Sequence, residues 1–385
     1  MKGEKLQTGL NRTEPRLNYL DNLRVSVVVL VVLHHIAMVY GAFAPFYYVE
    51  QPFQKSILIF CILNQSWFMG ALFLLAGYFT PPSFDRKGSR SFISSKLLRL
   101  GIPALIFYFV LNPLSSLGVY AMPPAMTGIH SGPAWTDYRA MLGLGPLWFA
   151  VLLLAFQLAY AAIAGMRGMR SSRRTKTKKP RPLIAIVLFS LGLAGISWAW
   201  RMLVPIGKAV WDFPSLGYLP QYVSFFAAGA ILSKSNVLSA VKGKTGIAAG
   251  AVAIAALLIL FPLAFSGRMF SLNLTAFGKS LGGGHWQSGV YAAFDSIFAV
   301  SWTIALIALF RKLSGNGSAP GRFMSAHSYT VYIIHIPVLI AVSVLLKDLA
   351  WPFMLKAGLN VILTLPLCFL LAWCIGKIPG AKRIL

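Results

Sequence analysis

The chain has 385 residues, of which 57% are hydrophobic and only 11% are charged, and its mean hydropathy is +0.70. A soluble domain usually carries about 25% charged residues. The composition therefore excludes an array of soluble domains. It indicates an all-α membrane protein built from apolar spans of roughly 20 residues.

The net charge is +26, from 35 Lys and Arg against 9 Asp and Glu. In a soluble protein this excess would suggest nucleic-acid binding, but in a membrane protein cytoplasmic loops retain positive charge. We therefore expect no nucleic-acid partner. A basic cytoplasmic face also attracts anionic membrane lipids or a phosphorylated substrate. Cys61, Cys368 and Cys374 lie in apolar runs without metal-binding spacing, so we expect no disulfide and no metal.

The first 20 residues are polar and lack a cleavage site, so they predict a cytoplasmic segment and not a signal peptide. Ten predicted spans follow, of which the sixth is the shortest and opens at Pro220. The spans lie near residues 22–41, 56–79, 97–117, 146–165, 183–204, 218–233, 246–266, 289–310, 328–346 and 351–375.

An even number of spans puts both termini on one side, and the charges agree with this. With a cytoplasmic N-terminus, 27 of the 35 Lys and Arg fall on the cytoplasmic side and 8 outside. We interpret 1–385 as one membrane domain with a basic cytoplasmic loop at 166–182. The external segment 118–145 is long and rich in Pro and Gly, and we expect it to cover part of a site.

The first span carries the most informative pair of residues. Arg24 and His35 are eleven positions apart, which places them within about 20° of one helix face and roughly 16 Å apart along the axis. Arg24 is then at the cytoplasmic interface and His35 near mid-membrane. Asp21 is placed to orient Arg24 at the i, i+3 spacing. His34 points about 100° away.

A histidine in an apolar span either bonds a neighbouring helix or has a function. Its pairing with an interfacial arginine on one face favours function, namely acyl transfer across the membrane. An acyl-CoA donor has phosphates that an arginine binds bidentately and a long thin arm that ends in a thioester. Histidine is the usual base for removing the proton of an attacking hydroxyl.

The second span is predicted to end at Tyr78, with a break at Pro81 and Pro82 before a basic loop. Cations near this loop are either topology signals or ligands for the donor's phosphates, and Arg99 lies inside the start of the third span. The candidate donor-binding residues are Arg24, Arg86, Lys96 and Arg99.

Two later spans carry polar residues. Ser328, Tyr332 and His335 follow the i, i+4, i+7 spacing, which indicates either a functional stripe or helix packing. Asp295 is a lone carboxylate in a span, a functional or paired group by default. Its partner is a histidine (His34, His35 or His335) or an arginine. We therefore take His35, Asp295 and His335 as candidate catalytic residues. His130 and His285 fall in external segments and are expected to be solvated.

Six motifs in order resemble the acyltransferase-3 family of membrane acyltransferases, in particular the branch that transfers succinyl groups to bacterial periplasmic glucans. They are YLDNLRVSVVVLVVLHH (19–35), FLLAGYFTPPSFDRKG with KLLRLGIP, GPLWFAVLLLAFQLAY, YLPQYVSFFAAGAIL, GGGHWQSGVYAAFD and SYTVYIIHIP.

The resemblance implies an O-acyltransferase in the bacterial inner membrane. Such an enzyme takes acetyl, succinyl or a similar group from cytoplasmic acyl-CoA and delivers it to an external glycan or glycolipid. His35 would be its base and Arg24 the companion. Two other classes stay open, a proton-coupled transporter or flippase and a non-catalytic scaffold for glycan assembly.

Overall fold

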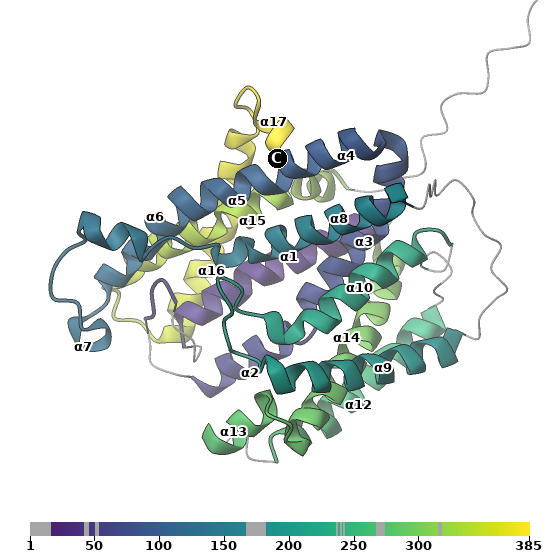
Figure 1. Cartoon of the computed structure of the whole chain (residues 1–385). Coiled ribbons are helices and arrows are strands. Elements are labelled where there is room, and N and C mark those ends of the chain that lie inside the picture. Colours follow the sequence, from purple (N-terminus) through teal and green to yellow (C-terminus); the bar gives the residue numbers. More distant parts are fainter. Residues whose placement is uncertain are drawn as a thin grey trace, which may run out of the picture.

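The computed structural model describes residues 17–41, 46–50, 54–166, 182–235, 238, 241, 243–266, 274–314 and 318–385. The described chain is a bundle of helices (Figure 1), and its only bridge of strand type is an isolated one between Val210 and Phe213. Most of the predicted N-terminal segment and of the basic loop 166–182 lies outside the described residues.

Nine helical segments within this described part are long and apolar enough to cross a membrane, which confirms a polytopic all-α bundle. They are α1 (Asn18–Val39), α2 and α3 (Lys55–Gln65 and Phe68–Lys87), a broken helix over Ser89–Ala121, α8 (Trp148–Met166) with its leading turn η5 (Gly145–Leu147), α9 (Pro182–Leu203), α12 (Gly243–Ala264), α14 (Trp286–Leu313), α15 (Ala319–Leu346) and α16 (Phe353–Ile375).

The predicted sixth span is α10 (Leu219–Leu232), which is shorter than the other nine. Its 14 residues rise only about 21 Å. It packs very closely along α3, because a Cβ added at Gly229 would lie 2.1 Å from the Leu74 carbonyl oxygen and one at Gly77 would lie 2.1 Å from that of Phe226. Small residues allow this approach, so α10 is held against α3 through backbone contact.

The second span differs from its prediction. The chain breaks at Ser66 and Trp67, between α2 and α3, and not at Pro81 and Pro82. The break is stabilised by the Gln221 amide, which donates to the Ser66 carbonyl at 2.7 Å. The two prolines lie in the last two turns of α3, where each removes one backbone hydrogen bond without ending the helix. The helix therefore continues to Lys87.

The third span is also longer than predicted, since it begins at Ser89 and not near residue 97. It is a broken helix with two wide π turns, η1 (Leu97–Gly101) and η2 (Phe107–Leu111). Its other parts are α4 (Ser89–Lys96), α5 (Ile102–Ile106), α6 (Asn112–Ser116) and η3 (Leu117–Ala121).

Each π turn is accompanied by a proline, which leaves one backbone carbonyl without its helical N–H donor. A tyrosine hydroxyl donates to that carbonyl instead. Pro103 has no N–H for the carbonyl of Arg99, which instead accepts from the Tyr329 hydroxyl at 2.5 Å. Pro113 likewise frees the Phe109 carbonyl, which accepts from the Tyr138 hydroxyl at 2.7 Å. Cross-helix tyrosines thus satisfy backbone groups that lipid could not.

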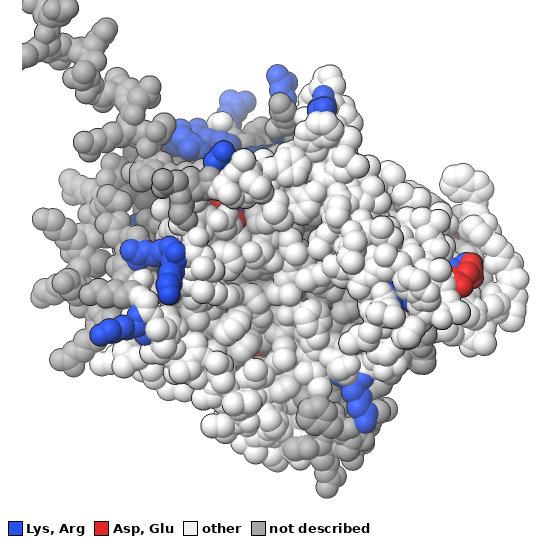
Figure 2. Space-filling model, turned by 180° about the vertical axis from the view of Figure 1, so that it is seen from behind, with Lys and Arg blue, Asp and Glu red and all other residues white. Residues whose placement is uncertain are grey.

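The start of α1 and the end of the chain lie at the same end of the bundle. Asn22 on α1 bonds Ser314 at the end of α14, and Arg99 bonds the carbonyl oxygen of Leu385, just after α17 (Ala381–Ile384). We call this the basic end because of the cations there, which are Arg86, Lys87, Arg90, Arg311, Lys312, Arg322, Lys377 and Arg383. Figure 2 shows most Lys and Arg of one face at the left and along the top, with a mostly white surface across the middle.

The centre of the bundle is formed by α1, α3, α14 and α15, whereas α9, α12 and α16 lie at the periphery with large apolar side chains exposed. The remaining short helices are α7 (Pro124–Thr127), η4 (Trp135–Arg139), η6 (Leu216–Tyr218) and α13 (Leu274–Leu281). In water, exposing these leucines and isoleucines would cost free energy, but in a bilayer they contact lipid tails.

Candidate active site

The polar stripe of α1 faces the polar stripe of α15. The Arg24 guanidinium donates to the Ser325 hydroxyl at 3.1 Å, and the rings of His35 and His335 are joined by a nitrogen–nitrogen contact of 3.1 Å. The contact partners increase in residue number together, from 24 to 35 along α1 and from 325 to 335 along α15. The two helices therefore run parallel. The prediction that Arg24 and His35 share a face is confirmed.

His35 lies near the end of its own helix but opposite the middle of a neighbouring one. His35 lies only four residues before the end of α1, yet its partner His335 lies near the middle of α15. α1 therefore ends well before α15 does, and non-helical chain at residues 46–50 packs beyond it. Irregular backbone at such depth occurs where it is buried in protein or lines a cavity.

Hydrogen-bond partners fix the protonation of the histidine pair. His335 Nδ1 lies 2.7 Å from the Tyr332 carbonyl and His35 Nδ1 lies 2.9 Å from that of Val31. A carbonyl oxygen only accepts, so in the neutral pair each Nδ1 carries the proton. His335 Nε2 then accepts from His35 Nδ1. The lone pair of His35 resides on Nε2, for which no partner is found within the described ranges.

The surroundings of His35 are aromatic. The Phe46 ring stacks on the imidazole with centroids 5.7 Å apart and planes 17° from parallel. Tyr332, one turn before His335, donates its hydroxyl to the carbonyl of Pro146 at the start of α8. His335 is fully buried and His35 only partly so, which leaves His35 the member of the pair that a substrate can reach.

His34 points elsewhere, as predicted. Its ring packs against Phe68 at the start of α3, with centroids 5.2 Å apart. It is 8% exposed, and its Nδ1 has no hydrogen-bond partner in the part of the chain that the structure describes. Its only ring neighbour of polar type is His35 itself, at 5.5 Å in an edge-on arrangement. The two histidines thus occupy different environments.

Arg24 is positioned as expected for a donor-binding residue. Asp21 forms the i, i+3 ion pair with it at 3.3 Å, and Ser325 holds the same Nη2 atom. The side chain of Arg24 is still 39% exposed. A guanidinium that is oriented on one side and accessible on the other is suited to bind a phosphate.

The structure places the backbone of Arg99 against α15, the helix that Arg24 contacts, whereas no contact among the described residues joins Lys96 or Arg86 to Arg24. The carbonyl of Arg99 is bonded by Tyr329, one turn after Ser325 on α15. Lys96 lies over the Phe92 ring at 5.2 Å, one turn earlier on the helix of Arg99. Arg86 is exposed at the end of α3.

Asp295 pairs with an arginine, one of the two possibilities left open by the sequence. The Arg201 guanidinium on α9 donates to Asp295 on α14, and both side chains are at most 1% exposed. Tyr218 and Tyr291 flank the guanidinium, with its central carbon 4.9 and 5.5 Å from their ring centroids. The Ser296 hydroxyl also donates to Asp295, at 3.4 Å. No hydrogen bond among the described residues joins Asp295 to the histidine pair.

Arg201 is a residue that sequence reasoning missed. Its position, three residues before the end of the predicted fifth span, led us to interpret it as an external charge. The sequence signal that could have identified Arg201 is its position in an apolar run, between Trp200 and Met202. An arginine there is costly without a buried partner, and Asp295 was the only carboxylate placed inside a predicted span.

A second buried ion pair was missed as well. Lys356 on α16 donates to Glu50, which lies in the chain between α1 and α2, and to the Lys347 carbonyl at 2.9 Å. Tyr48 also donates to Glu50, at 2.6 Å. Lys356 is 3% exposed. It lies inside the predicted tenth span, and that position was the available signal.

The external segment 118–145 meets the chain around the site at both of its ends. Near its start, the Met122 sulfur accepts from the backbone N–H of Val49 at 3.2 Å. Asn112 bonds the Met141 carbonyl at 2.7 Å and accepts the hydroxyl of Tyr47. Farther out, Asp137 is half-buried, and a hydrogen bond from the Tyr120 hydroxyl lowers the pKa of that carboxyl. The contacts with the chain near His35 thus come from the two ends of the segment. His130 and His285 are exposed, as predicted.

The cysteines are separate from the site. Cys61 and Cys368 are buried and Cys374 is exposed. Among the described residues no three His, Cys, Asp or Glu side chains are grouped so as to hold a metal ion. The expectation that the protein uses no metal stays a prediction.

Taken with the apolar spans, the site defines a polytopic membrane protein with an arginine and a histidine pair on one stripe of its bundle. The model of the acyltransferase domain family matches residues 17–373. The chain therefore belongs to the acyltransferase-3 family and is an acyltransferase. Neither the curated proteins nor the solved structures contained a match to it.

Proposed function

We propose that the protein is an O-acyltransferase of the bacterial inner membrane. It moves an acetyl, succinyl or similar group from cytoplasmic acyl-CoA to a hydroxyl of a glycan or glycolipid on the other side. The observation that carries this proposal is the parallel contact of α1 and α15, with Arg24 at one end of the stripe and the His35–His335 pair at the other.

The donor enters from the basic end in this proposal. Arg24 binds the phosphates of CoA, together with the other candidate cations of the same end, Arg99, Lys96 and Arg86. The rise between Arg24 and His35 is about 16 Å, a distance that the thin arm of CoA can cover while its nucleotide stays at the surface. The thioester then lies next to His35.

The chemistry needs one base and later one acid. The acceptor hydroxyl attacks the thioester carbonyl while its proton passes to His35 Nε2, and the new ester forms as the carbon–sulfur bond breaks. The proton on His35 then passes to the departing thiolate, which leaves as CoA thiol. General base catalysis of this kind contributes about 10²- to 10⁴-fold in rate.

His335 acts through His35 and not on the substrate. By accepting from Nδ1 it fixes the ring and leaves Nε2 as the basic atom, and it shares the positive charge when His35 is protonated. Asp295, neutralised by Arg201, has no part in this proton transfer. We assign it to holding α9 against α14.

The identity of the acyl group and of the acceptor rests on the family resemblance. The succinyl-transfer branch acts on periplasmic glucans, so a glucan hydroxyl is the first acceptor to test. No separate soluble domain for acceptor binding is evident in the described residues, and in this proposal the glycan reaches His35 from the end opposite the basic one.

Purified protein in liposomes tests the proposal. With acyl-CoA outside and glucan inside, or the reverse, free CoA thiol and acylated glucan should appear in equal amounts, and only when acyl-CoA contacts the basic end. Movement of glycan across the membrane without thiol release would identify a transporter instead. Mass spectrometry of glycans from cells with and without the protein then identifies the acyl group.

A further inference from the structure

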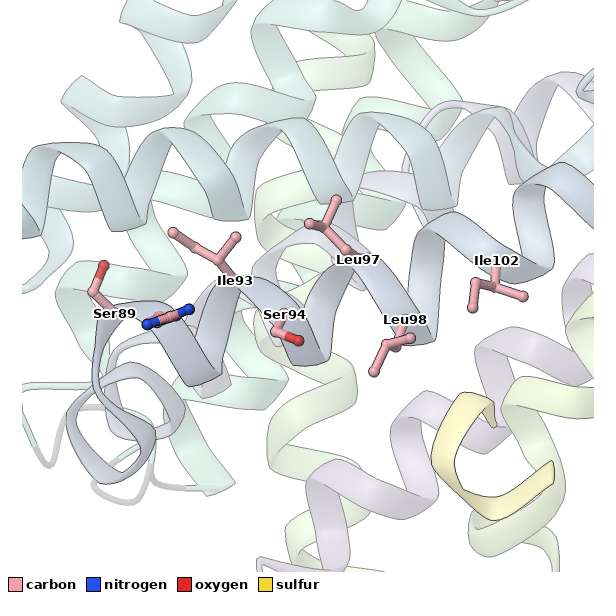
Figure 3. A pocket seen from close by; sticks show the side chains of 7 residues that line it. Ser89, Ile93, Ser94, Leu97, Leu98 and Ile102 are labelled. Atoms are coloured by element: carbon pink, nitrogen blue, oxygen red, sulfur yellow. The ribbon is translucent and has the colours of Figure 1, made fainter. Parts of the chain in front are cut away.

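A hollow of about 690 Å³ lies on the third span, separate from the site above (Figure 3). It is lined by Ser89, Arg90, Ile93, Ser94, Leu97, Leu98 and Ile102. The polar members come first, nearest the basic end, and the apolar ones follow toward the membrane interior. The hollow therefore has a polar mouth and an apolar floor along roughly 20 Å of one helix.

The hollow faces away from the bundle. On the opposite side of the same helix, Phe92 is fully buried and Leu100 is 8% exposed, whereas Leu97 and Leu98 are 47% and 41% exposed. Apolar side chains exposed on a membrane span contact lipid tails. The floor of the hollow is therefore a surface for an acyl chain.

The mouth of the hollow is cationic. Arg90 lines it, and Lys87 is held beside it by a hydrogen bond to Ser95 at 2.9 Å. No carboxylate of the described chain lies within ion-pair distance of Arg90. Two serine hydroxyls, of Ser89 and Ser94, open into the same space. An arginine with neighbouring hydroxyls is a set of donors that matches a phosphate.

We propose that this hollow binds one anionic phospholipid from the leaflet at the basic end. The phosphate accepts from Arg90 and from the hydroxyls of Ser89 and Ser94, and one acyl chain lies along Leu97, Leu98 and Ile102. The floor belongs to the π turn η1, which also carries Arg99. A bound lipid thus packs against the turn that holds a donor-binding candidate.

The site is tested on the full chain in neutral detergent by native mass spectrometry with phosphatidylglycerol and phosphatidylcholine. We expect one phosphatidylglycerol to be retained in preference to phosphatidylcholine and to raise the melting temperature, since a ligand of the folded state stabilises it. Arg90→Gln should weaken the retention by about tenfold, because a charge-assisted contact is lost. Arg383→Gln, at an exposed arginine of the same end, should leave it unchanged.

A second variant tests the floor without changing charge. Ser94→Trp fills the hollow and should also displace the phospholipid, with normal elution on gel filtration as the check of folding.

Equal retention of both lipids, or equal retention by the Arg90 and Arg383 variants, would overturn the proposal. So would displacement by inorganic phosphate, which indicates a plain anion site, or by acyl-CoA, which indicates a donor entrance. Because the readout is lipid binding, these outcomes do not depend on acyl transfer.

Discussion

Arg24 and His35 both contact the neighbouring helix α15, and each is also held by contacts on or beside α1. Ser325 and Asp21 hold the guanidinium, and His335 holds the imidazole. The roles of the two side chains are therefore separable. Changes at Arg24 should affect donor binding, and changes at the histidine pair should affect the chemical step.

Arg24→Lys should raise the KM for acyl-CoA by roughly tenfold with little change in kcat. The lysine keeps the charge but loses the planar fork that binds a phosphate through two hydrogen bonds. Initial rates of thiol release at varied acyl-CoA measure this. An unchanged KM for the donor together with a raised KM for the acceptor would contradict the assigned role.

His335→Gln should lower kcat by about tenfold or more and leave the KM for acyl-CoA unchanged, because His335 orients the base without touching the donor. Adding this change to His35→Gln should cost little more than His35→Gln alone, since the two residues act as a unit. Additive losses in the double variant would show that His335 has a separate function.

The helices themselves are positioned by close backbone contact and by polar side chains that replace missing backbone bonds. α10 is too short to span the bilayer core alone, and its contact with α3 through Gly77 and Gly229 fixes it. The third span keeps its two π turns because Tyr329 and Tyr138 satisfy the carbonyls that prolines leave free.

Gly229→Ala tests the contact of α3 with α10. The added Cβ would lie 2.1 Å from a backbone oxygen, so the helices must separate, at a cost of about 1–3 kcal/mol or more. Thermal unfolding in detergent should show a clearly lower midpoint. Gly250→Ala is the matched control, since its Cβ would meet the Ala305 Cβ at an ordinary 3.7 Å. Equal midpoints for the two variants would contradict the account of this interface.

Across the whole bundle, the buried pair of Arg201 and Asp295 connects two long helices that are distant in sequence. Asp295→Asn leaves the guanidinium buried without its counter-charge, and the loss of stability should be about 3–5 kcal/mol. The double variant Arg201→Met, Asp295→Leu should recover much of it. Normal stability with lost activity in Asp295→Asn would instead return Asp295 to the catalytic residues.

Apolar length predicted where most of the helical spans lie, and helix periodicity predicted that Arg24 and His35 share a face. They were not sufficient for features that depend on a partner from another helix. The break at Ser66 is stabilised by Gln221, and the buried Arg201 is stabilised by Asp295. Neither partner is local in sequence, so helix propensity and hydropathy carry no signal for the pairing.

The same limit applied to the site. His35 and His335 were both singled out, but their contact depends on α1 and α15 lying side by side, which spacing within one span does not determine. The Glu50–Lys356 pair was overlooked because Lys356 was counted as an external charge and Glu50 was not considered. A rule that every charge inside a span needs a partner would have identified Lys356.

The most direct measurement compares His35→Gln with His34→Gln in proteoliposomes, with thiol release from acyl-CoA as the readout and gel filtration as the check of folding. His35→Gln should lose about 10²- to 10⁴-fold in kcat, whereas His34→Gln, which packs against Phe68 outside the pair, should keep most of its activity. Full activity in the His35 variant, or equal losses in both, would contradict the proposed role of His35 as the base.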